Sequence, residues 1–256
     1  MMTGLLELHD VSLSFKGVRA LNALSFSVAK GEICALIGPN GAGKSSLLNV
    51  INGVYRADAG DIVFDGLRFE AIHPQKAAHL GIGRTFQHNA LFRRLSVREN
   101  VLVGLSRHGN ASFFENIFRL GRDGAERQGF LARAERTMSF LGLDRHAGRI
   151  VSTLPYGLQK RVDLARALVA GPKLLLLDEP MAGMNQEEKE EMSRVIREVN
   201  RVFGSTVVLI EHDVGIVLNL ASHVVVLDYG RKLADGAPDE VRKNPDVIAA
   251  YLGTVH

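Results

Sequence analysis

Cysteine is almost absent from this chain of 256 residues. With Cys34 as the single cysteine, no disulfide framework can form within the chain, and a cytosolic compartment fits. Cys34 stands in the apolar run Ile-Cys-Ala-Leu-Ile at residues 33–37, so we interpret it as a buried strand residue rather than a reactive thiol. Hydrophobic residues make up 46% of the sequence, which is enough to bury a sizeable core without disulfides.

Long apolar runs and a strong net charge are missing as well. No stretch approaches the roughly 18 to 20 apolar residues of a membrane span, and residues 1–4 lack the features of a signal peptide. We therefore expect any membrane role to be peripheral. The net charge of +3 is small for this length and disfavours binding of nucleic acid by a large basic patch.

No repeat of 20 to 50 residues and no low-complexity tract is present, which sets aside solenoids and disordered arms. The pattern along the chain instead indicates strands and helices in a definite order. Strands are expected at 5–15, 20–28, 33–37, 174–177, 206–210 and 224–227, and helices from about residue 44 and at 98–105, 125–143, 158–170, 186–203 and 213–221.

This order predicts an α/β fold in which a helical segment is inserted. The first two strands alternate as an antiparallel layer does, whereas the later apolar strands are typical of a parallel sheet covered on both faces. We expect one domain over 1–256, with 1–94 and 172–256 as the α/β core and 95–171 as a helical subdomain.

A glycine-rich segment at residues 38–45 reads Gly-Pro-Asn-Gly-Ala-Gly-Lys-Ser, which fits the phosphate-loop (P-loop) pattern of nucleotide-binding proteins. It lies between a predicted strand and a predicted helix, the context that the pattern requires. The glycines let consecutive N–H groups point at phosphate oxygens, Lys44 neutralises the β- and γ-phosphates, and the Ser45 hydroxyl can ligate Mg²⁺. The alternative is a glycine-rich turn that binds nothing. The candidate nucleotide contacts are Gly38, Pro39, Asn40, Gly41, Ala42, Gly43, Lys44, Ser45 and Ser46.

Two carboxylates follow the apolar strand at 174–177. They stand at the carboxyl edge of the expected sheet, where α/β proteins hold their ligands. We expect Asp178 to hold Mg²⁺, directly or through water, and Glu179 to orient or deprotonate the water that attacks the γ-phosphate. A solvated acidic turn before Pro180 is the alternative.

With these motifs in register, nearly the whole chain resembles the ABC ATPase family. The resemblance implies a RecA-like P-loop NTPase core, an antiparallel β layer and an inserted α-helical subdomain. It also implies that Phe15 stacks on adenine, that Gln87 touches Mg²⁺ and the attacking water, and that His212 senses the γ-phosphate. Taken singly, Phe15 could be a core residue, Gln87 a loop amide and His212 a residue at a helix start.

Residues 154–161 resemble the family's signature motif, Leu-Ser-Gly-Gly-Gln, at the start of a helix. Pro155 replaces the serine that normally reaches the partner subunit's γ-phosphate, Tyr156 replaces a glycine, and Leu158 replaces the glutamine. We therefore expect the anion to be held by N–H groups from Gly157 onward and by the helix dipole. A helix start with no nucleotide role is the alternative.

The segment 179–185 and the ending 250–253 are similar to the ATPases of branched-chain amino acid importers. An extra segment at 106–129 shares this similarity. Its apolar residues Phe113, Phe114, Ile117 and Phe118 favour core packing over contact with a permease or the membrane. Related importers carry urea, short amides or aromatic acids, so the group does not fix the solute.

The resemblance therefore implies an ATPase that binds ATP and Mg²⁺ and powers uptake at the cytoplasmic face of the inner (plasma) membrane. Its implied partners are transmembrane permeases, which the region 88–103 should contact, and a second ATPase subunit, either identical or paralogous. A periplasmic or extracellular solute-binding protein acts indirectly, and no nucleic acid is expected. An ATPase of lipid or lipopolysaccharide export and a nucleic-acid-associated ABC ATPase are the alternatives.

Overall fold

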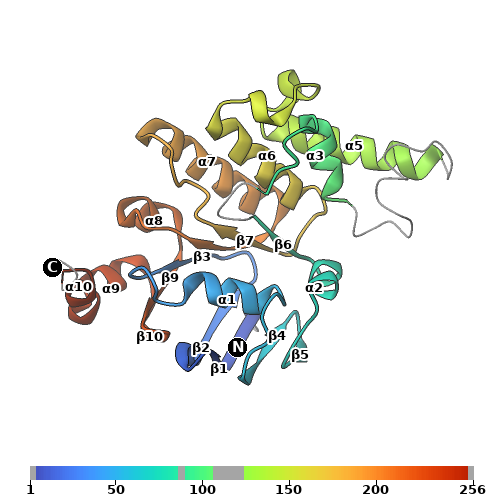
Figure 1. The fold of residues 1–256 in the computed structure, drawn as a ribbon. Helices are drawn as coiled ribbons and strands as arrows, with labels where there is room; N and C mark the ends of the chain where they lie inside the picture. Colours follow the sequence, from blue (N-terminus) through green and yellow to red (C-terminus); the bar gives the residue numbers. More distant parts are fainter. Residues whose placement is uncertain (1–3, 86–89, 106–123, 253–256) are drawn as a thin grey trace.

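The computed structural model describes residues 4–85, 90–105 and 124–252 (Figure 1). An antiparallel sheet is formed by β1 (Gly4–Phe15), β2 (Val18–Ala29), β4 (Ala59–Phe64) and β5 (Leu67–Phe69), in the order β2-β1-β4-β5. The hairpin pairs Phe15 with Val18 at its tip, and the alternating burial along β1 follows from a sheet with one buried face. The predicted antiparallel layer is confirmed.

A second, mostly parallel sheet runs in the order β10-β9-β3-β8-β7-β6. Its strands are β3 (Ile33–Ile37), β6 (Ile82–Arg84), β7 (Leu174–Asp178), β8 (Thr206–Ile210), β9 (His223–Asp228) and β10 (Arg231–Gly236), of which β10 alone among the described strands of this sheet is antiparallel to its neighbour. All five residues of β3, β7 and β8 are buried, as expected for strands covered on both faces. Burial of Cys34 confirms that it is a core residue of β3.

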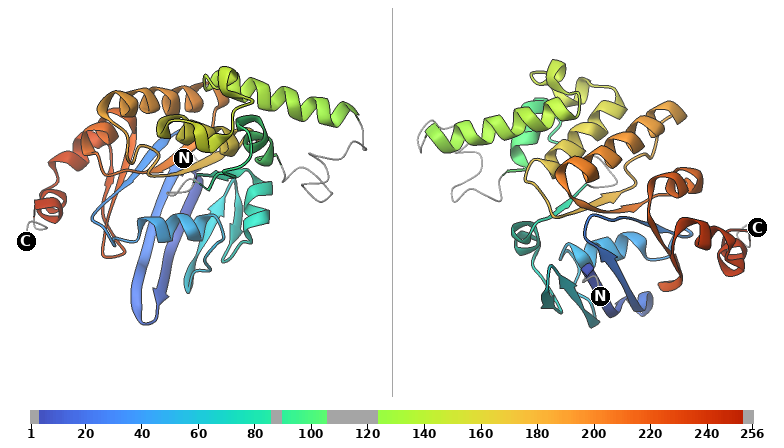
Figure 2. Two further views of the ribbon diagram at one scale, coloured as in Figure 1. Left: turned by 45° about the horizontal axis from the view of Figure 1, so that its top comes forward. Right: turned by 180° about the vertical axis from the view of Figure 1, so that it is seen from behind.

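The two faces of this sheet pack into two cores. Ile33, Ala35 and Ile37 face one core, and Cys34 and Leu36 face the other. The first core is closed by α3 (Val97–Val103), α5 (Gly124–Phe140), α6 (Tyr156–Leu168), α7 (Gln186–Phe203), α8 (Val214–Leu220) and α9 (Pro238–Lys243), and the second by α1 (Lys44–Ile51), α2 (Pro74–Leu80) and the antiparallel sheet. Figures 1 and 2 show this arrangement, with α3, α5, α6 and α7 on one side of the parallel sheet and α1 and the antiparallel sheet on the other.

The helices between β6 and β7 lie where the sequence predicts them, with ends shifted by one to three residues. Short 3₁₀ turns at η2 (Asp144–His146) and η3 (Val151–Thr153) connect α5 to α6. The sequence predicts none of α2, β4, β5, β6, β10, α9 or α10 (Pro245–Leu252), because short segments carry little periodicity. The division into a core at 1–94 and 172–256 and a helical subdomain at 95–171 stays a prediction. Within the described ranges, no helix is both long and apolar enough to cross a membrane.

Candidate nucleotide site

The loop between β3 and α1 needs glycine at two positions. Gly38 has φ +145°, and a Cβ atom there would lie 2.0 Å from the backbone oxygen of Leu227. Gly43 has φ +99°, and its Cβ would lie 2.4 Å from the backbone oxygen of Ala20. Any side chain at either position would collide with backbone, so the glycines of the predicted loop follow from how closely β2 and β9 approach it.

Lys44 is the first residue of α1 and is only 6% exposed. Its ammonium donates to the carbonyl oxygens of Gly38, at 2.7 Å, and Pro39, at 2.9 Å. Burial lowers the pKa of Lys44, while the charges of Glu179 and Asp178 act in the opposite direction. The glycine-rich loop therefore surrounds the Lys44 ammonium at the N-terminus of α1. The positive charge and the helix dipole together favour binding of an anion there.

Asp178 ends β7 and is buried. Its Oδ1 lies 3.4 Å from the Ser45 hydroxyl, and its Oδ2 lies 3.2 Å from Nη2 of Arg84. Arg84 also donates to Oδ1 of Asn49 at 2.6 Å, so α1, β6 and β7 meet at this carboxylate. Burial raises the pKa of Asp178, and Arg84 opposes that shift. The arrangement turns one carboxylate oxygen toward Ser45.

Glu179, the next residue, has a left-handed backbone with φ +49°. This conformation is unfavourable for a residue with a side chain, and outliers of this kind cluster at functional sites. Its Oε1 lies 2.9 Å from Nε2 of His212, whose side chain is 44% exposed. The two side chains thus meet at the carboxyl ends of β7 and β8, as the sequence predicts for functional residues of an α/β sheet.

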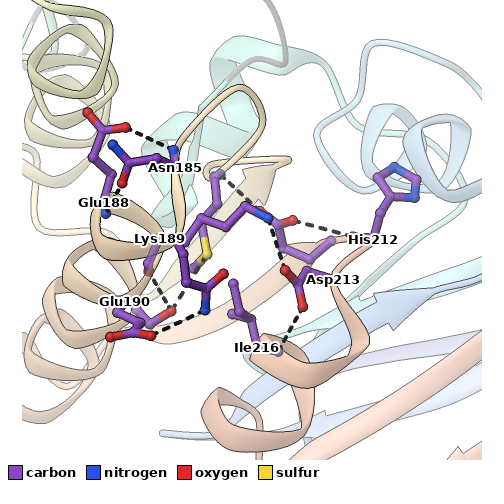
Figure 3. A network of polar contacts seen from close by, with 11 residues as sticks. Asn185, Glu188, Lys189, Glu190, His212, Asp213 and Ile216 are labelled. Carbon is purple, nitrogen blue, oxygen red and sulfur yellow. Dashed lines mark hydrogen bonds and ion pairs between the residues drawn. The ribbon is translucent and has the colours of Figure 1, made fainter.

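A network of polar contacts joins the loops that carry these two residues (Figure 3). Glu211 is buried, its Oε1 accepts from the N–H of Met181 at 2.9 Å, and its Oε2 accepts from the N–H of His212 at 3.3 Å. Burial raises the pKa of Glu211. Close by, Lys189 of α7 donates to Asp213 at 2.9 Å, so the loop of His212 is tied to the segment after Glu179.

A cavity of about 300 Å³ brings most of the predicted residues together. Its described lining consists of Ala20, Asn40, Gly41, Ala42, Gly43, Lys44, Ser45, Ser46, Glu179 and His212. Asp178 reaches it through Ser45. Four predicted contacts are not among these lining residues: Phe15, Gly38, Pro39 and Gly157. Gln87 lies outside the described residues, as do Phe113, Phe114, Ile117 and Phe118 of the predicted extra segment.

Phe15 stands at the end of β1 and is 42% exposed, which excludes the core alternative. Its ring meets Tyr55 edge to face, with centroids 5.1 Å apart. An exposed ring is free to stack on a base, and the adenine contact stays a prediction.

The segment that resembles the signature motif begins α6 at Tyr156, two residues earlier than expected. Pro155 is the N-cap, and no described side chain caps the helix. The helix geometry leaves the first N–H groups, including that of Gly157, without partners inside the helix. The expected anion-binding end therefore has the backbone that the prediction requires, and its use stays a prediction.

Three buried charged residues of the site region were not assigned by the sequence reasoning: Arg84, Lys160 and Glu211. Glu211 directly follows the fully buried strand β8, where a charge is unusual and is itself a usable signal. Arg84 ends the short strand β6, of which only Ile82 is buried, so its position carries no such signal. Lys160 lies in a helix of mixed polarity, where no such signal exists.

Comparison with known proteins agrees with this geometry. A family model described as "ABC transporter" matches residues 21–182, more than half of the chain. This chain belongs to the ATP-binding subunits of ABC transporters. As a member of that family it binds ATP and hydrolyses it for transport.

A second model, described as "Branched-chain amino acid ATP-binding cassette transporter", matches residues 231–256 of this ABC ATPase. The chain is 37% identical to the high-affinity branched-chain amino acid transport ATP-binding protein LivG of Escherichia coli strain K12, over 97% of this chain and 98% of that protein. It is 36% identical to BraF of Pseudomonas aeruginosa, a protein with the same description, over the same shares. These matches confirm the predicted branched-chain amino acid type.

Solved structures confirm the fold of this ABC ATPase. It resembles a nucleotide-free ATP-binding cassette from an ABC transporter with a TM-score of 0.85 and 31% identity, over 97% of this chain and 99% of that one. An ATP-binding cassette in its ADP conformation matches with a TM-score of 0.86, also at 31% identity, over 98% and 99% of the two chains. The fold that carries the site described above is therefore the fold of ATP-binding cassettes.

Proposed function

We propose that this ABC ATPase powers uptake of branched-chain amino acids, or of a related small solute such as an amide, urea or an aromatic acid, through partner permeases. The observation that carries the ATPase part is the cavity in which Lys44, Glu179 and His212 converge on a phosphate loop. The printed descriptions of LivG and BraF, together with the match over residues 231–256, support the solute class.

The loop from Gly38 to Ser46 holds the phosphates of ATP, with Lys44 as the charge that meets the β- and γ-phosphates. Displacing the carbonyls of Gly38 and Pro39 from the Lys44 ammonium frees its donors for phosphate oxygens. Phe15 supplies an exposed ring for adenine.

Ser45 and Asp178 would hold Mg²⁺, with Gln87 as a further ligand. A hydroxyl and a carboxylate oxygen 3.4 Å apart suit a cation that takes oxygen ligands, so the residues fit the ion. When bound, Mg²⁺ neutralises phosphate charge. Arg84 keeps the other Asp178 oxygen turned away from this position.

Glu179 accepts the proton of the attacking water, or orients that water, beside the γ-phosphate. The imidazole of His212, 2.9 Å from Glu179, stands where it can sense whether that phosphate is present. Loss of the γ-phosphate then removes the anion shared by two subunits, and the dimer reopens.

The second subunit, identical or paralogous, presents the N-terminus of its own α6 to this ATP. Pro155 offers neither hydroxyl nor N–H there, so the anion rests on backbone N–H groups from Tyr156 and Gly157 and on the helix dipole.

The permease meets a groove of about 390 Å³ beside β6, α3 and α6. Its lining includes Phe92, which is 42% exposed, together with Gly83, Val103 and Ala167. An exposed aromatic in an apolar groove is a typical anchor point for a helix of a partner. This docking places the chain at the cytoplasmic face of the membrane, with the solute-binding protein on the other side.

The variant Glu179→Gln tests the catalytic part of this proposal. The amide keeps the size of the side chain and removes the base, so we expect hydrolysis to fall by about 100-fold or more while ATP traps a stable dimer. ATPase assays and size-exclusion chromatography with ATP measure both effects, with the exposed Glu187→Gln in α7 as the control. A Glu179→Gln protein that stays monomeric with ATP and hydrolyses at the wild-type rate would refute the proposal. Ligand screening of the solute-binding protein that serves the same permeases tests the solute class.

A further inference from the structure

Lys160 lies in the first turns of α6, five residues after Pro155, and is only 4% exposed. Burying an ammonium group is costly unless its hydrogen bonds are satisfied. A buried lysine in the helix that begins with the signature segment therefore needs a reason, and the roles proposed above do not include it.

The ammonium of Lys160 reaches the backbone of the catalytic loop. Its Nζ donates to the carbonyl oxygen of Glu179 at 3.3 Å. The same carbonyl accepts from the N–H of Ala182 at 3.2 Å, and the N–H of Glu179 donates to the carbonyl of Ile210 at 3.1 Å. Both polar ends of a residue in the left-handed region are thus held by hydrogen bonds.

Tyr156 steadies the lysine from one turn earlier in α6. The Lys160 Nζ lies 5.7 Å from the centroid of the Tyr156 ring, within the range of a cation–π contact. The same ring packs on Gly183, where φ is +77° and a Cβ atom would lie 3.2 Å from Cε1 of Tyr156. Tyr156 stands at the position where the signature motif has a glycine, so this contact belongs to the chain's own version of the motif.

Further contacts join α6 to α7. A Cβ atom on Gly157 would lie 3.1 Å from Oε1 of Glu188, and Arg161 forms an ion pair with Glu191 of α7. The start of α6 is therefore fastened within one subunit to the segment that follows Glu179. Figure 1 shows α6 beside α7, above the end of β7.

We propose that Lys160, steadied by Tyr156, is a positioning residue for ATP hydrolysis. The lysine fixes the peptide of Glu179 in the left-handed conformation that aims its carboxylate at the cavity and at His212. This inference rests on the proposed function, because it assumes that Glu179 acts on the attacking water. It explains why a buried cation is kept in a helix whose N-terminus faces the partner's nucleotide.

The test compares Lys160→Met, Lys160→Arg, Tyr156→Phe and Tyr156→Gly in the transporter complex reconstituted with its permeases. For Lys160→Met we expect kcat of ATP hydrolysis to fall about tenfold, with KM for ATP within twofold of the wild type. Lys160→Arg can donate to the same carbonyl and should recover at least half of the wild-type kcat. Tyr156→Phe keeps the ring that contacts Lys160 and should lower kcat by less than Tyr156→Gly, for which we expect a loss of about threefold. Lys173→Met, which removes a lysine that is 56% exposed, is the control.

Three outcomes would overturn this inference. The first is an unchanged kcat in Lys160→Met. The second is an unchanged kcat with KM raised several-fold, because the ammonium would then act on bound phosphate rather than on Glu179. The third is a lower kcat that Lys160→Arg does not recover, accompanied by a lower Tm, which would indicate a structural role only. Glu179→Gln, assayed in parallel, separates the two proposals: if it stays active the proposed function fails, and if it is inactive while Lys160→Met is normal only the present inference fails.

Discussion

The two ends of the parallel sheet both carry charged residues with shifted pKa values, yet the shifts at the two ends run in opposite directions. At the carboxyl end, burial lowers the pKa of Lys44 and Arg84 and raises the pKa of Asp178 and Glu211. All four shifts disfavour the charged forms. Interactions within the chain therefore do not fully offset the free-energy cost of burying these charges.

At the amino end, His223 begins β9 and lies between two carboxylates. Its Nε2 lies 2.6 Å from Oδ1 of Asp235, and its Nδ1 lies 3.4 Å from Oε2 of Glu32. Hydrogen bonds, with Asp235 first, raise the pKa of His223 to about 12. The pKa of Asp235 is lowered chiefly by its bond to His223. Burial raises the pKa of Glu32, but the hydrogen bonds from His223 and from the N–H of Ala29, together with the charge of His223, outweigh burial and lower it. The shifts of these three residues favour their charged forms, whereas burial raises the pKa of the Cys34 thiol beside them.

The direction of the pKa shifts thus distinguishes the carboxyl-end site, where a ligand could stabilise the buried charges, from the amino-end cluster, where the charged residues stabilise one another. Perturbed groups alone do not distinguish the two, because structural ion pairs also shift pKa values. Substitutions at the carboxyl end should therefore lower ATPase activity with little effect on stability. Substitutions at the amino end should lower stability with little effect on ATPase activity.

Lys44→Met should give the largest effect. Removing the ammonium withdraws the charge that meets the phosphates, so we expect kcat/KM for ATP hydrolysis to fall by about 100-fold or more. Because burial already disfavours the charged form, the free energy of unfolding without nucleotide should change by less than about 1 kcal/mol. ATPase assays and urea unfolding check both halves, with Lys76→Met on the exposed face of α2 as the control. A variant that unfolds far more easily would contradict the comparison at this end.

Features of the carboxyl-end site can be predicted from the sequence when the residues that determine them are close together in the chain. The loop around Gly38 and Gly43 was predicted because its glycine spacing is encoded in consecutive residues. Asp178 and Glu179 were predicted because one ends and the other directly follows an apolar strand, where parallel strands place their ligands. His212 was predicted only from the resemblance to the ABC ATPase family.

The contacts that hold those residues could not be predicted in the same way. Arg84 reaches Asp178 across 94 positions of the chain, and Glu211 reaches Met181 across 30. Lys160 meets Glu179 only because α6 packs beside the end of β7. Such pairs depend on tertiary packing, and one sequence without relatives carries no signal of which partner a buried charge will find.

His223→Gln should have the next largest effect, on stability. Removing the shared cation leaves two partly buried carboxylates together, which should lower the free energy of unfolding by about 2 to 3 kcal/mol near pH 6. A pKa raised in the folded state contributes stability fully below the unfolded value, near 6.5, and loses it as the pH rises toward 12. The gap between wild type and variant should therefore shrink by at least about 1 kcal/mol between pH 6 and pH 9.

Urea unfolding at the two pH values measures this gap, and ATP hydrolysis at a temperature where both proteins are folded should stay within twofold. His9→Gln is the matched control, because the His9 side chain is 42% exposed against 13% for His223. A gap that is independent of pH would show that His223 does not act as a cation, and the contrast between the two ends would fail.

Pro155→Ser should give the smallest effect and bears on how the carboxyl-end site is completed. Pro155 has φ −52° and ψ 151°, an extended conformation that serine adopts as an N-cap. The new hydroxyl adds one hydrogen bond to the anion held at the start of α6, worth about 1 kcal/mol, so we expect the ATP-bound dimer to form about fivefold more tightly. Sedimentation of the Glu179→Gln protein with ATP measures the dimer Kd, and Pro155→Ala, which adds no hydroxyl, controls for relief of the proline ring. Equal tightening by serine and alanine would mean that the gain comes from removing the proline ring, and that the backbone N–H groups of Tyr156 and Gly157 already satisfy the phosphate without a hydroxyl.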